Sequence, residues 1–104
     1  MNVSSIDFDA LRPQIAVLCR KWGIVELSVF GSAARGDDRP DSDVDLLYVA
    51  DHSTTDLSGV AFLSEAPLEF AALLGRPVDL VPKAGLHRVI RDDVVSESRV
   101  LYAA

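Results

Sequence analysis

Apolar residues near the start of the chain recur at steps of three and four positions. This spacing predicts an amphipathic helix over residues 8–22 that is closed by Gly23. The apolar face of this helix consists of Phe8, Leu11, Ile15, Leu18 and Trp22. Because proline has no N–H group to donate inside a helix, we expect Pro13 to delay the continuous helix until close to Arg12, after a loose turn.

Three short runs rich in β-branched residues predict strands, at about residues 25–30, 43–50 and 77–82. Between the second and third runs, residues 57–74 alternate apolar and small side chains in a helical pattern. We expect Pro67 to break or restart that helix, because its ring clashes with the preceding turn.

The last part of the chain, "LHRVIRDDVVSESRVLY", predicts a helix followed by a short strand or extended tail. The expected apolar face of this helix comprises Leu86, Val89, Ile90 and Val94. Helices and strands therefore alternate from end to end, with no internal repeat or linker. We predict one domain of mixed helix and strand over residues 1–104.

Composition limits the kind of function that this domain can have. The 104 residues are 49% hydrophobic and 25% charged, with a formal net charge of −6. An acidic chain lacks the basic footprint that binding to long duplex nucleic acid requires. No apolar run reaches the roughly 20 residues that cross a bilayer, and the start has no signal-peptide pattern, so we expect a cytoplasmic protein. The single cysteine, Cys19, is expected to be a buried structural thiol.

Two aspartates interrupt the second predicted strand. Residues two apart in a strand share a face, so Asp43 and Asp45 should point the same way, opposite to Val44. Two carboxylates about 5 Å apart repel by about 3 kcal/mol at an effective dielectric near 20, and a cation would offset this cost. Carboxylates at this spacing can bridge a pair of divalent ions of the kind that phosphoryl-transfer enzymes use. Asp79 repeats the same apolar-acid-apolar pattern in the third strand and is the third candidate ligand.

A candidate phosphate site lies directly before these acids, in "GSAARG". Gly31 permits close backbone approach, and Ser32 opens a short helix whose free N–H groups favour phosphate oxygens. The Ser32 hydroxyl and Arg35 could assist. The chain has no GxxxxGK[ST] P-loop, no GxGxxG, and no EF-hand pattern.

Each feature also has a structural explanation. Asp43 and Asp45 could extend a solvated acidic loop, and Asp79 could cap a strand or pair with Arg76. His52 and His87 are expected at the surface. The acidic residues Asp92, Asp93 and Glu97 are expected on the wet face of the last helix.

In combination, the motifs are more specific. Gly31-Ser32, ten intervening residues and then Asp43-Val44-Asp45 resemble the signature of the DNA polymerase β-like nucleotidyltransferases. The strings "FGSAARG", "SDVDLLYV", "LLGRPVDLV" and "IRDDVVSESRVLYA" look like those of the minimal nucleotidyltransferase (MNT) domains, and this likeness covers nearly the whole chain.

The resemblance implies an α+β domain with a mixed, mostly antiparallel sheet. It implies that Asp43, Asp45 and Asp79 bind two Mg²⁺ ions, with Asp79 also helping to activate the acceptor hydroxyl. Gly31 and Ser32 would hold the triphosphate of ATP, supported by Arg35. The family's activity would be transfer of AMP to a tyrosine of a partner HEPN ribonuclease toxin, for which the MNT protein is the antitoxin.

Two alternatives to this enzymatic antitoxin remain open on the residues alone. The chain could neutralise a toxin by forming a complex without catalysis. It could also transfer a nucleotide to a small molecule, although one minimal domain offers few walls for such a pocket.

Overall fold

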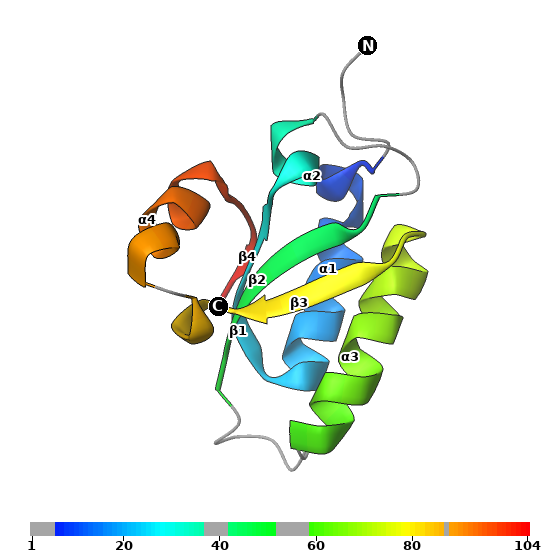
Figure 1. Cartoon of the computed structure of the whole chain (residues 1–104). Helices are drawn as coiled ribbons and strands as arrows, with labels where there is room; N and C mark the ends of the chain where they lie inside the picture. Colours follow the sequence, from blue (N-terminus) through cyan, green and yellow to red (C-terminus); the bar gives the residue numbers. More distant parts are fainter. Residues whose placement is uncertain (1–5, 37–41, 52–58, 87) are drawn as a thin grey trace.

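The computed structural model describes residues 6–36, 42–51, 59–86 and 88–104. Its strands are β1 (Ile24–Phe30), β2 (Val44–Ala50), β3 (Val78–Pro82) and β4 (Arg99–Ala103). They form one sheet in the order β3-β2-β1-β4, seen in Figure 1. Strand β1 is antiparallel to β2 and β4, whereas β2 and β3 are parallel. The expected mixed, mostly antiparallel sheet is confirmed.

Two long helices, α1 (Phe8–Trp22) and α3 (Gly59–Leu74), lie side by side on one face of the sheet. Their apolar stripes and the inward side chains of the strands make one core, because each element has an apolar face that must be covered. Phe62 joins the layers: its ring lies 6.1 Å from that of Trp22 in α1 and 5.0 Å from that of Tyr48 in β2.

The expected delay of the first helix by Pro13 is wrong. Helix α1 is continuous from Phe8, with Pro13 inside it. The first turn is held by other groups: the Asp7 carboxylate accepts from the Ala10 N–H at 3.1 Å, and the Asp7 carbonyl accepts from the Leu11 N–H at 3.3 Å. Phe8 is buried and anchors the turn to the core, so the helix tolerates the one missing donor.

Pro67 likewise does not break its helix, contrary to expectation. Helix α3 runs without interruption through this position. Phe62, Ala66, Phe70 and Leu74 lie four residues apart and are all buried. Burial of this stripe against the sheet and α1 outweighs the loss of one backbone hydrogen bond, because tertiary packing supplies most helical stability in proteins.

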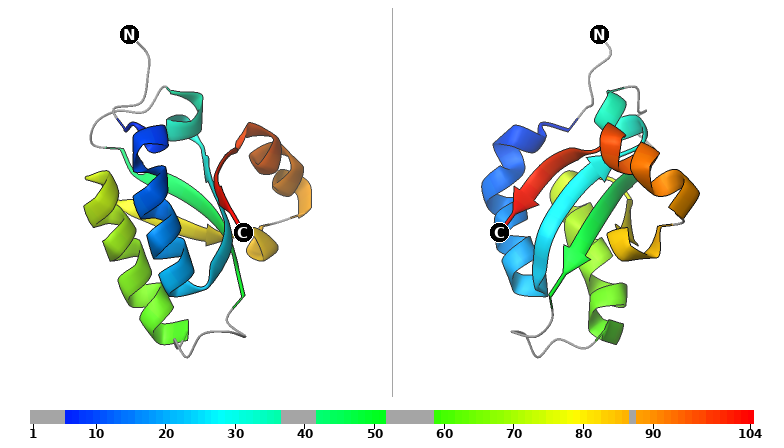
Figure 2. Two further views of the ribbon diagram at one scale, coloured as in Figure 1. Left: turned by 180° about the vertical axis from the view of Figure 1, so that it is seen from behind. Right: turned by 90° about the vertical axis from the view of Figure 1, so that its left-hand side faces the viewer.

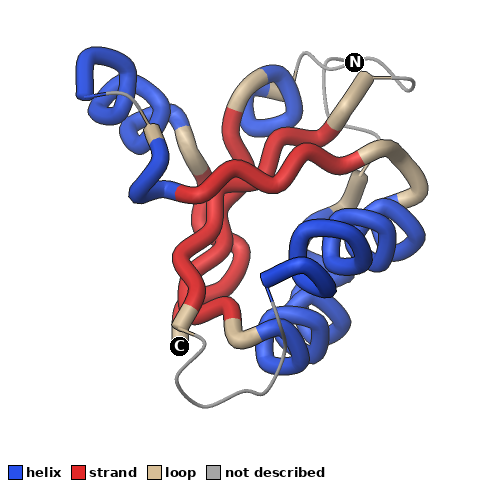
Figure 3. Tube along the Cα trace, turned by 60° about the horizontal axis from the view of Figure 1, so that its bottom comes forward, coloured by secondary structure: helices blue, strands red, loops and turns tan. Residues whose placement is uncertain are grey.

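Three small elements lie elsewhere: α2 (Ser32–Arg35), the 3₁₀ turn η2 (Lys83–Gly85) and α4 (Arg88–Glu97). Figure 3 shows α4 and η2 on the side of the sheet opposite to α1 and α3, with α2 at one end of the sheet. Among the described residues, no helix is long and apolar enough to cross a membrane.

The predicted apolar face of the last helix is only partly correct. Leu86 precedes α4 instead of belonging to it, and Ile90 is 48% exposed. Val94 is half-buried, and the side chain of Val89 lies outside the described part of the structure. Helix α4 therefore contributes little to the core.

Candidate active site

Asp45 and Asp79 occupy matching positions on the two parallel strands. Asp45 of β2 is the register partner of Asp79 of β3, and it also faces Phe30 of β1 across the antiparallel ladder. Its neighbours Val44 and Leu46 are fully buried in the core. Because side chains alternate along a strand, both carboxylates project from the other face of the sheet, the one that carries α4.

The two carboxylates interact across the strands. Asp45 is half-buried, and this burial, followed by the nearby charges of Asp79 and Asp43, raises the pKa of the Asp45 carboxyl above its usual range. Burial and like charge both penalise the ionised form. Asp79 is exposed on the edge strand β3, so solvent or a second molecule can reach it.

Asp43 does not lie in the strand, contrary to the expected range of 43–50. Strand β2 begins at Val44, and Asp43 is exposed immediately before it. Its place beside β3 is fixed by backbone contacts, because the Val44 N–H donates to the Pro77 carbonyl at 2.8 Å. Asp43 thus approaches Asp45 from the start of the strand.

Arg76 helps to position the start of β2 beside β3. The sequence suggested this residue only as a possible ion-pair partner of Asp79. It is buried, with 7% of its surface exposed, and its Nε donates to the Ser42 carbonyl at 3.0 Å. This bond ties the residue before Asp43 to the start of β3. The sequence did contain one indication of this role, because Arg76 is a charged residue directly before the strand predicted at residues 77–82.

Gly31 packs directly against Asp45. Its φ of 72° and ψ of −150° lie in a region that is essentially restricted to glycine. A Cβ at this position would lie 2.7 Å from Asp45 Oδ2, so only glycine allows the backbone to approach the carboxylate this closely. The observed contact is with Asp45, and the expected approach of a phosphate to Gly31 stays a prediction.

Helix α2 starts at Ser32, as expected, with Gly31 as its N-cap. The N–H groups of Ala34 and Arg35 donate to the Gly31 carbonyl, at 3.1 and 3.2 Å. The N–H groups of Ser32 and Ala33 come earlier in the helix and have no acceptor within it, as at any helix start. The turn therefore presents backbone donors next to Asp45.

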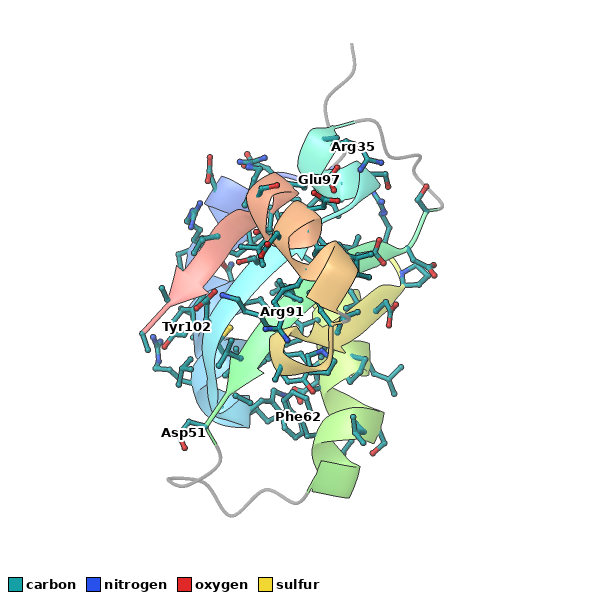
Figure 4. All side chains as sticks on the ribbon, turned by 60° about the vertical axis from the view of Figure 1, so that its left-hand side comes forward. Arg35, Asp51, Phe62, Arg91, Glu97 and Tyr102 are labelled. Atoms are coloured by element: carbon teal, nitrogen blue, oxygen red, sulfur yellow. The ribbon has the colours of Figure 1, made fainter. Side chains whose placement is uncertain are left out.

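Arg35, the last residue of α2, contacts α4. Its Nη1 lies 3.2 Å from Glu97 Oε1, and both side chains are about half exposed, at 48% and 44%. Figure 4 shows the two residues together where α2 meets the end of α4. The sequence analysis expected Glu97 only on the solvent-exposed face of the last helix. Arg35 and Glu97 are 62 positions apart, so no local sequence pattern indicates that they form a pair.

The carboxylates suit a hard divalent cation, although they are not gathered around one point. Among the described residues, no group of three or more His, Cys, Asp or Glu side chains forms an assembled metal site. Nevertheless, Asp79 and Asp43 both raise the pKa of Asp45, so the three acids share one region of negative charge. Carboxylate oxygens are the ligands that Mg²⁺ prefers, and a bound cation would offset their repulsion.

Other sequence expectations have separate outcomes. Asp92 and Asp93 are exposed on α4, as expected. Cys19 is fully buried, and burial raises the pKa of its thiol to about 12. His52 and His87 lie outside the described residues.

Comparison of this chain with known proteins shows its family. A family model described as the nucleotidyltransferase domain matches residues 11–102. The protein adenylyltransferase MntA of Thermococcus cleftensis is 40% identical over 80 residues, which cover 77% of each chain.

Two solved structures have the same fold. One protein, described as a candidate minimal nucleotidyltransferase, is 35% identical, with a TM-score of 0.72 over 92% of this chain and 97% of its own. The other belongs to a toxin–antitoxin complex crystallised with AMP-PNP; it is 25% identical, with a TM-score of 0.68 over 89% of this chain and 73% of its own. The α+β fold expected for the chain is confirmed.

Proposed function

Because this chain belongs to the nucleotidyltransferase domain family, we propose that it transfers AMP from ATP to a tyrosine hydroxyl of a partner HEPN ribonuclease toxin and thereby acts as the antitoxin. The observation that carries the proposal is the register pair of Asp45 and Asp79 with Gly31 packed against Asp45. Support for the partner comes from the relatives: one is named a protein adenylyltransferase, and another was crystallised in a toxin–antitoxin complex with AMP-PNP.

In this proposal, Asp43, Asp45 and Asp79 hold two Mg²⁺ ions. Bound there, the ions would neutralise charge on the phosphate oxygens and on the departing pyrophosphate. A cation is needed in any case, because the chain has a net charge of −6 and its three acids would repel a triphosphate.

Phosphate binding and proton transfer are assigned to residues of the chain itself. Gly31 and the start of α2 receive the β- and γ-phosphates on backbone N–H groups, with the Ser32 hydroxyl and Arg35 as further donors. This places the α-phosphorus next to Asp45. The acceptor oxygen bonds to the α-phosphorus, the bond to the pyrophosphate oxygen breaks, and the hydroxyl proton leaves toward Asp79.

Asp79 suits the acceptor side of the site better than Asp45 does. It is exposed on the edge strand β3, where a side chain of another folded protein can approach it. Asp45 is half-buried between β1 and β3 and is shielded from such an approach. We therefore assign nucleotide binding chiefly to Asp45 and activation of the acceptor to Asp79.

The test is label transfer from α-labelled ATP to a HEPN-family toxin mixed with this chain in the presence of Mg²⁺. We expect Asp45→Asn and Asp79→Asn each to reduce transfer at least about a hundredfold. Asp92→Asn, which removes the same charge from an exposed site on α4, should leave transfer unchanged.

Three results would contradict the proposal. Transfer that persists in the Asp45→Asn/Asp79→Asn double variant would exclude these residues from catalysis. Toxin neutralisation by that variant, or by wild type in the presence of EDTA and without ATP, would favour an antitoxin that acts by complex formation alone. Label on a small molecule instead of the toxin would favour the second alternative, a nucleotidyltransferase that acts on small molecules.

A further inference from the structure

Three features follow one another along the sheet. At one end, β1 passes Asp45 at Phe30 and continues into Gly31 and α2. In the middle lie Asp45 and Asp79. Tyr48 and Pro82 form a second register pair on β2 and β3. This pair lies three residues beyond Asp45 and Asp79, in the direction that leads away from α2. At about 3.3 Å per residue, this second pair lies about 10 Å from the carboxylates.

A groove opens at this far end of the sheet. It has a volume of about 540 Å³, which lies within the range of small-molecule sites. Its walls come from the ends of β2 and β3, from η2 and from α4, and include Tyr48, Val49, Pro82, Lys83, Ala84 and Arg91. The groove thus has apolar walls and two cationic side chains.

The two cations have defined positions. Lys83 Nζ lies 3.2 Å from Glu26 Oε1 of β1, and Arg91 Nη2 donates to the Leu86 carbonyl at 3.4 Å. Figure 4 shows Arg91 on α4, away from the end that carries Glu97. A guanidinium beside apolar walls suits a flat aromatic ring, because it can stack on the ring face while its N–H groups keep their partners.

We propose that this groove binds the nucleoside part of the nucleotide, with Arg91 against the base. The inference rests on the proposed function, which places the β- and γ-phosphates at α2 and the α-phosphate at the carboxylates. The nucleoside must then leave the α-phosphate on a side away from α2, and the groove lies on that side along the same two strands.

The acceptor is the competing occupant, and the structure favours a different path for it. A tyrosine carried by a folded protein needs an open approach, which exposed Asp79 on the edge strand β3 provides. The groove is bounded by four separate elements and suits a small, flat group better than a protein surface.

The experiment measures binding to the full chain with Mg²⁺ and without any acceptor. The probes are AMP-PNP and inorganic tripolyphosphate, which carries no nucleoside. Ala84→Trp fills the groove from an exposed position in η2. The matched control is Ala72→Trp, an exposed position that lines a different groove, between α1 and α3.

We expect Ala84→Trp to weaken AMP-PNP binding at least about tenfold and to leave tripolyphosphate binding within about twofold of wild type. Arg91→Ala should weaken AMP-PNP binding about fivefold, again without an effect on tripolyphosphate. Ala72→Trp should change neither affinity.

Two outcomes would overturn this inference alone. In the first, Ala84→Trp binds AMP-PNP as well as wild type does and also keeps AMP transfer in a separate assay with the acceptor present. In the second, Ala84→Trp keeps its AMP-PNP affinity but loses AMP transfer in that separate assay, which would assign the groove to the acceptor. If wild type binds no AMP-PNP, the proposed function fails together with the inference, and this result is distinct from the other two.

Discussion

Asp45 and Asp79 are directly paired across the parallel strands β2 and β3, and backbone hydrogen bonds of the ladder hold them there. The sheet therefore enforces a like-charge contact that the side chains alone would avoid. Such an arrangement lowers stability in the absence of a cation and prepares a site for one.

Removal of the Asp45 charge should stabilise the metal-free protein. Since the pKa of the Asp45 carboxyl is raised in the folded state, ionisation costs more there than in the unfolded chain. We expect Asp45→Asn to increase the free energy of unfolding at pH 7 by roughly 0.5–1 kcal/mol, after allowance for solvent screening. Urea denaturation without Mg²⁺ measures this change.

The pH dependence of this effect has a definite sign. Below the ordinary value of 3.8, Asp45 is protonated in both states, and the gain from Asp45→Asn should disappear. It should grow as the pH rises through 3.8 and the folded-state pKa. Asp92→Asn is the control for a general change in net charge, and an equal gain in both variants would contradict the assignment to Asp45.

Gly31→Ala should be costly in both stability and nucleotide affinity. The new Cβ would lie 2.7 Å from Asp45 Oδ2, at a φ of 72°. We expect a loss of about 2–3 kcal/mol in the free energy of unfolding, together with weaker AMP-PNP binding.

Gly75→Ala is the matched control for that substitution. Gly75 has nearly the same φ, 74°, but a Cβ there would meet nothing within 4 Å. It should therefore lose only about 1 kcal/mol from backbone strain, with AMP-PNP affinity unchanged. Equal effects of the two variants would show that contact with Asp45 is unimportant.

Glu97→Gln should improve ATP binding slightly. Glu97 pairs with Arg35 at 3.2 Å and so competes with a triphosphate for that guanidinium. We expect the KM for ATP to fall about twofold to threefold, with stability changed by less than about 0.5 kcal/mol because the pair is half exposed. Asp93→Asn on the same helix serves as the control, and an unchanged or higher KM for Glu97→Gln alone would contradict competition.

Cys19 should be chemically inert in the folded protein. The thiol is fully buried, and its pKa of about 12 leaves almost no thiolate at pH 8. Labelling by iodoacetamide should be at least about a hundredfold slower in buffer than in denaturing urea. Rapid labelling of the native protein would show that α1 opens readily at this position.

Periodicity and spacing revealed much of this protein in advance. The apolar steps in residues 8–22 and the β-branched runs located α1 and the first three strands, because burial imposes a period of 3.6 on helices and 2 on strands. The Gly31-Ser32 and Asp43-Val44-Asp45 motifs indicated the family, since each residue type serves a local requirement for close approach or charge. These features are encoded within a few neighbouring residues.

Other features depend on contacts that the linear pattern does not contain. Pro13 and Pro67 were expected to disrupt helices, yet packing of Phe8 and of the Phe62–Leu74 stripe keeps both helices continuous. The pairing of Asp45 with Asp79, the bond from Arg76 to Ser42 and the contact of Arg35 with Glu97 all join distant positions. Only the tertiary structure decides them, because strand order and register result from the packing of the whole domain.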